Sequence, residues 1–138
     1  MDQILSAAMA QPPTQADGGG FIYLYFLKDI HGRWIVKIGE STWPPRRKKE
    51  WDRQCAPQRH IWFEYALWVP WRKKMEGLLH LWATLNGAWL GYVLCRYCGI
   101  HHREQFDLGN CGGMWTIIQT AMAFVFKMGW PSWWYGSL

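Results

Sequence analysis

The sequence predicts a single α/β domain in which helices flank a small antiparallel sheet of about three strands. An uninterrupted apolar and aromatic run at residues 21–27 suits a buried strand. A second apolar segment at residues 34–39 follows a His31-Gly32 turn and completes an antiparallel hairpin. Apolar residues then recur with a helical period after residue 70. A length of 138 residues supports one domain and not two.

The remaining elements are predicted in chain order. Trp43-Pro44-Pro45 ends the second strand and starts a helix that runs to about Gln54, because proline suits the first helical turn. Residues 60–68 are an aromatic-rich third strand. Residues 88–111 are a loop or short-strand region, with a short strand at 103–108. Residues 115–127 are apolar nearly all round, which is typical of a packed helix.

The clearest predicted helix covers residues 71–85. Its buried side is marked by apolar residues at every third or fourth position, namely Trp71, Met75, Leu78, Leu79, Trp82 and Leu85. Its other side carries Lys73, Glu76, His80 and Thr84 with the same spacing.

Three segments are expected along the chain. Residues 1–17 carry little pattern, and prolines and glycines interrupt them or follow them, so they are predicted to be a mobile arm. Residues 18–128 form the domain itself. Residues 129–138 are too rich in tryptophan for a solvated tail, so we expect them to fold back or to support protein association or self-association.

The charge favours an anionic partner. The formal net charge is +5 and the isoelectric point is near 9.2. Basic residues gather in two stretches, at residues 46–53 and 72–74, and the predicted nucleic-acid contacts are Arg46, Lys48, Lys49, Arg53 and Lys73. The sequence has no apolar run of about 18 residues and no secretory signal. We therefore expect an intracellular protein without a membrane span, and a nuclear one if the source is eukaryotic.

Five separated pieces of sequence occur in a familiar order: GFIYLYFLKD, WIVKIGES, RRKKEWDRQC, MEGLLH and HHREQF. Over residues 18–108 they resemble the GIY-YIG nuclease superfamily, and within it a phage-type DNA-binding branch that also occurs in fungi. That branch typically has VKIG as its second motif. The resemblance implies a GIY-YIG-like layered fold and cleavage of phosphodiester bonds in DNA.

The resemblance also implies roles for individual residues. Tyr23 occupies the position of the first-motif tyrosine, although Phe21 replaces the usual glycine, and Lys37 stands where a second tyrosine is commonest. Ten residues later, Arg47 matches the phosphate-binding arginine, with Arg46 as the alternative. Glu76 matches the glutamate that holds Mg²⁺ or Mn²⁺, and His80 follows it by one helical turn. Tyr23, Lys37 and His80 are all candidates for activating or positioning water.

A second metal site is predicted from the segment CRYCGIHH at residues 95–102. Two cysteines three apart, with histidine close behind, suit half of a structural zinc site. The preferred Zn²⁺ ligands are Cys55, Cys95, Cys98 and His102, and Cys111 is a competing ligand. Four cysteines in an apparently intracellular chain favour thiols or metal ligands over disulfides.

Three functions remain open at this point. The first, which we favour, is a metal-dependent endonuclease. The second is a DNA-binding module that kept the fold and lost cleavage, which the departures at Phe21 and Lys37 keep open. The third is a protein-interaction domain that is stabilised by a structural zinc ion.

Overall fold

A computed structural model describes residues 2–28, 31–43, 61–62, 66–91, 93–94, 101–102 and 105–129, with only the backbone described at residues 61, 62, 93, 94, 101 and 102. Its helices are α1 (Gln3–Ala10), α3 (Arg72–Leu85) and α4 (Met114–Met128). Its strands are β1 (Gly20–Lys28), β2 (Trp34–Ser41), β3 (Ile61–Trp62), β4 (Leu67–Val69), β5 (Val93–Leu94), β6 (His101–His102) and β7 (Gln105–Asp107). This arrangement confirms the predicted α/β class.

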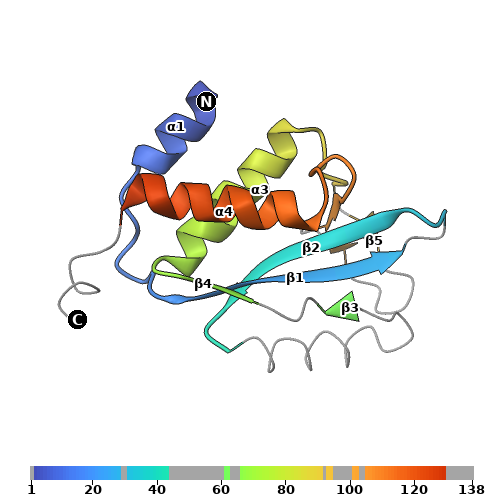
Figure 1. Ribbon diagram of the computed structural model, residues 1–138, viewed down its shortest axis with the longest axis horizontal. Helices are drawn as coiled ribbons and strands as arrows, with labels where there is room; N and C mark the ends of the chain where they lie inside the picture. The colour runs from blue at the N-terminus through green and yellow to red at the C-terminus, as the bar shows by residue number, and fades with distance from the viewer. Residues whose placement is uncertain are drawn as a thin grey trace.

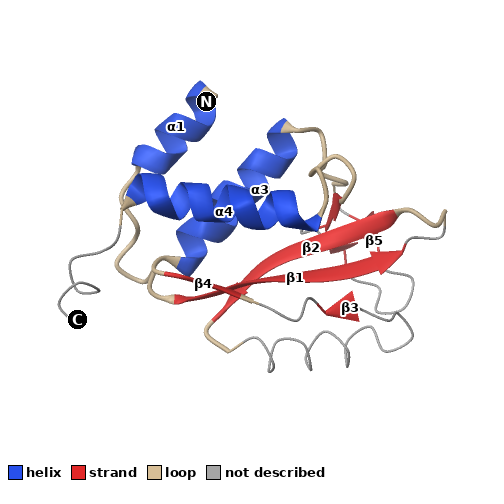
Figure 2. Ribbon diagram, in the orientation of Figure 1, coloured by secondary structure: helices blue, strands red, loops and turns tan. Residues whose placement is uncertain are grey.

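The sheet is antiparallel and is built around the predicted hairpin. The strand order is β3-β1-β2-β7, and β4 also pairs with β1, while β5 and β6 form a separate pair. The predicted third strand at 60–68 is represented by two short strands, β3 opposite residues 25–26 of β1 and β4 opposite residues 20–22. The helices lie together on one side of the hairpin (Figures 1 and 2).

The two faces of the hairpin have different surroundings because side chains alternate along a strand. Ile22, Leu24 and Phe26 of β1 and Val36 and Ile38 of β2 belong to the core that the helices cover. The intervening residues point to the opposite face.

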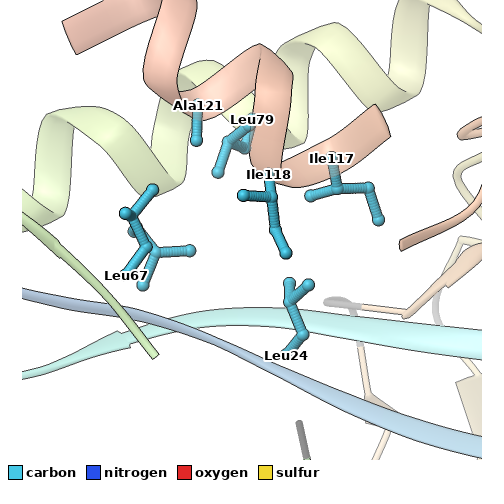
Figure 3. Close-up of a pocket in the computed structure, with 7 residues that line it drawn as sticks. Leu24, Leu67, Leu79, Ile117, Ile118 and Ala121 are labelled. Carbon is cyan, nitrogen blue, oxygen red and sulfur yellow. The ribbon is translucent and has the colours of Figure 1, made fainter. Parts of the chain in front are cut away.

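Helices α3 and α4 complete the core above the first face. The buried residues of α3 are Met75, Leu78, Leu79 and Ala83, and those of α4 are Ile117, Ala121, Phe124 and Val125. Leu85, which was predicted to be buried, is 41% exposed at the end of α3. Aliphatic side chains from the sheet and both helices surround a gap of about 10 Å³ (Figure 3). A gap of this size and lining is a packing defect and not a ligand pocket.

Helix α1 was not predicted, because residues 1–17 were expected to be a mobile arm without regular structure. Asp2 caps its first turn by accepting from the Ile4 N–H at 2.7 Å, and Leu5 is buried in the main core. The Lys74 ammonium donates to the carbonyl of Met9 at 2.8 Å. Desolvation lowers the pKa of Lys74, and the nearby Asp17 carboxylate opposes this shift.

The start of α3 is capped by a residue that lies far away in the sequence. Both carboxylate oxygens of Asp17 accept backbone N–H groups, from Lys73 and Lys74, each at 2.9 Å. The Arg72 N–H donates to the carbonyl of Gly18 at 2.9 Å. A carboxylate at a helix N-terminus satisfies unpaired N–H groups and interacts favourably with the helix dipole. The segment before β1 therefore helps to fix α3 against the sheet.

Candidate functional site

The β1–β2 hairpin brings the predicted tyrosine and lysine onto one face of the sheet. Tyr23 is paired with Gly39, and Tyr25 with Lys37, so all four lie on the face opposite the helices. The rings of Tyr23 and Tyr25 are 5.1 Å apart and are tilted by 57°. The exposed fractions are 3% for Tyr23, 0% for Tyr25 and 2% for Lys37. This face is therefore a second, smaller core that contains polar atoms.

Gly39 permits the Tyr23 ring to lie directly across β2. A Cβ atom at position 39 would be 2.6 Å from Cε2 of Tyr23 and closer still to Cζ and the hydroxyl oxygen. No residue with a side chain fits there unless the ring moves. The glycine of the VKIG motif thus lets the Tyr23 phenol lie over the backbone of β2 at Gly39.

Helix α3 brings three polar side chains to the same part of β2. Arg72, Glu76 and His80 are spaced by four residues and so share one side of the helix. Arg72 Nε lies 2.9 Å from a carboxylate oxygen of Glu40. His80 Nε2 lies 2.7 Å from the carbonyl oxygen of Ile38. Glu76 lies on α3 between these two anchored side chains.

The contact with Ile38 shows which nitrogen of His80 donates a hydrogen bond. A carbonyl oxygen only accepts hydrogen bonds, so Nε2 of His80 carries the proton and donates it. The Glu76 carboxylate lies 3.7 Å from the same nitrogen, and the His80 ring is 5.1 Å from that of Phe106. Among the described residues, β7 pairs with β2 only at residues 35–37, so His80 binds the first residue beyond that pairing. His80 holds the β2 backbone and was not predicted to do so.

Tyr23 and His80 thus approach two adjacent residues of β2, Gly39 and Ile38, from opposite faces of the sheet, and Glu76 lies beside His80. The Glu76 side chain is 20% exposed and does not point into the apolar core. Position 47, the predicted phosphate-binding arginine, and the basic residues Arg46, Lys48, Lys49 and Arg53 lie outside the described part of the chain.

The second basic stretch is less available than its sequence indicated. Of its three residues, Arg72 is bound to Glu40 and Lys74 to the Met9 carbonyl, whereas Lys73 is exposed. Sequence reasoning missed the roles of Glu40 and Arg72 because 32 positions separate them. The only available signal was a single acidic residue directly after the VKIG motif.

The donor set at Glu76 fits a magnesium-type ion. Mg²⁺ keeps several waters and is commonly bound through one or two carboxylates and the substrate phosphate. Glu76 is a partly exposed carboxylate, the type of hard oxygen ligand that such an ion binds. Within the described residues, no group of three or more His, Cys, Asp or Glu side chains is placed to form an all-protein site.

The zinc prediction falls mostly on residues that the structure does not describe. Cys55, Cys95 and Cys98 lie outside the described ranges, and only the backbone of His102 is described, in β6. The competing ligand Cys111 is a free thiol with 1% exposure in the main core. Burial, and secondarily the Asp107 carboxylate, raise its pKa to about 11. Cys111 is thus disfavoured as a thiolate ligand.

Comparison with known proteins identifies the family to which the chain belongs. Residues 20–116 match the T5orf172 domain, a phage-associated domain that is related to nuclease-like folds and suggests a nuclease or DNA-binding role. No curated protein and no solved structure matches the chain. None of the described helices is long and apolar enough to cross a membrane. The match covers the hairpin, α3 and the start of α4, and with them the whole candidate site, so the chain belongs to the T5orf172 domain family.

Proposed function

We propose that this domain is a metal-dependent DNA endonuclease of the GIY-YIG type. The observation that carries the proposal is that Tyr23 crosses β2 at Gly39 on one face of the sheet, while the His80–Glu76 pair of α3 lies at the neighbouring Ile38 on the other face. A phenol and a histidine that neighbours a carboxylate are brought to adjacent residues of β2 from a strand and a helix that are far apart in the sequence. This is more specific than any of the sequence motifs taken singly, and membership of a nuclease-like family supports it.

Each residue has a role in this proposal. Glu76 would hold Mg²⁺ or Mn²⁺, which when bound neutralises charge on the phosphate and on the leaving oxygen. Arg47 would bind the phosphate oxygens through its planar fork. Tyr23 and Lys37 would position or deprotonate the attacking water. The remaining basic residues, Arg46, Lys48, Lys49, Arg53 and Lys73, would contact the DNA backbone.

His80 is a positioning residue in this scheme. Its Nε2 proton is used in the bond to Ile38, which ties α3 to β2 beside Gly39. Since Glu76 lies one turn earlier on the same helix, with its carboxylate 3.7 Å from His80 Nε2, this bond would help to fix the carboxylate relative to β2. The effect of His80 on cleavage would be exerted through the placement of Glu76.

One observation favours a second candidate function, a DNA-binding module that does not cleave. Tyr23 is 3% exposed and Lys37 is 2% exposed, so neither is presented to a substrate in this conformation. A hydrolytic role for them requires the face of the sheet opposite the helices to open when DNA binds. A module that only binds DNA needs no such opening.

The experiment that separates these functions is plasmid nicking with and without Mg²⁺ or Mn²⁺, combined with duplex binding in EDTA. The endonuclease proposal expects nicking by the wild type. It also expects Glu76→Gln to lower nicking at least about 100-fold, because several kcal/mol of charge stabilisation is lost. DNA binding by Glu76→Gln should stay within about twofold, since duplex affinity comes mainly from Lys and Arg contacts.

Asp107→Asn is the matched control, because its side chain is also 20% exposed but lies at the other end of the β2–β7 pairing. It should nick like the wild type. Wild-type protein that binds DNA and fails to nick with either ion would support the binding module. Absence of salt-sensitive DNA binding would refute both and support an interaction domain.

The structural zinc site belongs to the same proposal. Cys55, Cys95, Cys98 and His102 would bind one Zn²⁺ and tie the segment before β7 to the rest of the domain. Metal analysis of the purified protein should give about one zinc per chain, and chelation should lower the melting temperature. If the purified protein contains no zinc, these thiols have ordinary packing roles and the zinc proposal is wrong.

A further inference from the structure

Helix α4 presents an exposed apolar stripe on the side that does not face the core. Trp115 is 62% exposed, Met122 is 56% exposed and Phe126 is 85% exposed. With the exposed Gln119 they are spaced by four, three and four residues, so they line one side of the helix. Figure 1 shows α4 lying across α3 in the helical layer. Such a stripe on the surface of a domain marks an interaction site.

The stripe carries no charge. The sequence of α4 is MWTIIQTAMAFVFKM, and Lys127 is its one charged residue. An apolar partner surface would therefore meet no unpaired charge within the stripe. A DNA backbone would meet no cation in the stripe and only Lys127 elsewhere on α4, so the stripe is not suited to nucleic acid.

We propose that this stripe binds a second copy of the chain across a two-fold axis, with the two α4 helices antiparallel. An axis between Gln119 and Met122 places Trp115 opposite the partner's Phe126, and the converse pair follows by symmetry. Two aromatic pairs then flank a centre made of Met122 and Gln119 side chains. Large aromatic rings facing one another across an interface are effective anchors.

Charge selects the antiparallel arrangement over a parallel one. In the antiparallel pair, each Lys127 lies near the partner's Met114, so the two ammonium groups are about 20 Å apart along the helix axis. That distance exceeds the screening length of about 8 Å at physiological salt. A parallel pair would place the two lysines beside each other and would align the helix dipoles unfavourably.

The available area indicates a reversible dimer. A large aromatic side chain offers about 150–250 Å². The exposed parts of Trp115, Met122 and Phe126 then amount to roughly 400–500 Å² per copy, which gives about 800–1,000 Å² for a pair. This is at the low end for specific interfaces, where weak and transient complexes are found. We therefore expect a dissociation constant in the range of about 10–100 µM.

The first test is sedimentation velocity of the full-length protein from about 5 to about 200 µM, a range that spans the expected dissociation constant. The wild-type mass should rise from 16.3 kDa towards that of a dimer. Phe126→Glu should weaken association at least about tenfold. Leu85→Glu is the matched control, because Leu85 is an exposed apolar residue in the last turn of α3, as Phe126 is in the last turn of α4. It should associate like the wild type.

The second test concerns the register. A photo-crosslinking benzoylphenylalanine in place of Phe126 should attach to the partner chain near Trp115, and mixing chains of two isotopic masses identifies links between copies. A wild type that stays monomeric, or Phe126→Glu that associates as well as Leu85→Glu, would overturn the proposal. Crosslinks confined to residues 130–138 of the same chain would also overturn it. These readouts do not depend on nuclease activity.

Discussion

Replacement of Gly39 by alanine would test the crossing of β2 by the Tyr23 ring. No positive φ is found at Gly39, so alanine is compatible with its backbone. The obstacle is the ring itself, because the new Cβ would be 2.6 Å from Cε2 and closer to two further atoms. Ordinary contact begins near 3.4 Å. The ring must therefore move by close to 1 Å or more, although Tyr23 is 3% exposed and packs against Tyr25.

The expected cost follows from this overlap. Adding a methyl group to a packed interior typically costs about 1–3 kcal/mol of unfolding free energy. Without the ring, the same substitution would be favourable by about 0.5–1 kcal/mol, since alanine loses less backbone entropy in a strand than glycine. The effect of Gly39→Ala should therefore change sign in a Tyr23→Val background. The coupling between the two positions should be about 2 kcal/mol or more.

The assay is urea unfolding of the wild type, both single variants and the double variant, followed by tryptophan fluorescence. With a urea dependence of about 2 kcal/mol per molar, Gly39→Ala alone should lower the midpoint by about 0.5–1.5 M. The four free energies form a double-mutant cycle. If Gly39→Ala has the same effect in both backgrounds, within about 0.5 kcal/mol, the Tyr23 ring does not cross the strand at Gly39 and the proposed site loses its geometric basis.

Three further results are expected. Asp17→Ala should destabilise the protein by about 1–3 kcal/mol in thermal or urea unfolding, because two N–H groups of α3 lose their acceptor and the helix dipole loses a carboxylate; Asp2→Ala, at the short α1, should cost less. His80→Ala should lower nicking, and His80→Gln, which keeps a donor for Ile38, should restore part of it; equal loss in both would contradict a positioning role. Cys111 in the native protein should react with iodoacetamide at pH 8 about 100-fold more slowly than an ordinary thiol, because its pKa is raised to about 11. The labelling rate is measured by mass spectrometry, and rapid labelling of Cys111 would contradict its burial.

The hairpin and the main helix could be predicted because their signals are local. An apolar run, a turn and a helical period each depend on neighbouring residues, and β1, β2 and α3 lie within a few residues of the predicted bounds. The predicted strand at 60–68 was less accurate, because aromatic content alone does not show where a strand is interrupted. Its pairing with β1 is divided between β3 and β4.

The site was harder to predict because its contacts join distant parts of the chain or involve the backbone. His80 was recognised as a candidate, but its partner is a carbonyl oxygen, which no residue type reveals. The Asp17 cap of α3 spans 56 positions, and residues 1–17 gave no periodic signal that would place a helix there. Burial of Lys37 was also unexpected, since lysine is almost always exposed.

The Asp17 cap has a consequence for how this domain is delimited. The family match begins at residue 20, three positions after the carboxylate that starts α3. A unit cut at the match would leave behind the acceptor for two backbone amides, the Met9 carbonyl that receives Lys74, and the buried Leu5. The contacts that stabilise α3 and the core therefore extend beyond the matched residues. In this chain, residues 3–19 therefore contribute to the stability of the helix that carries Glu76 and His80, although they lie outside the match.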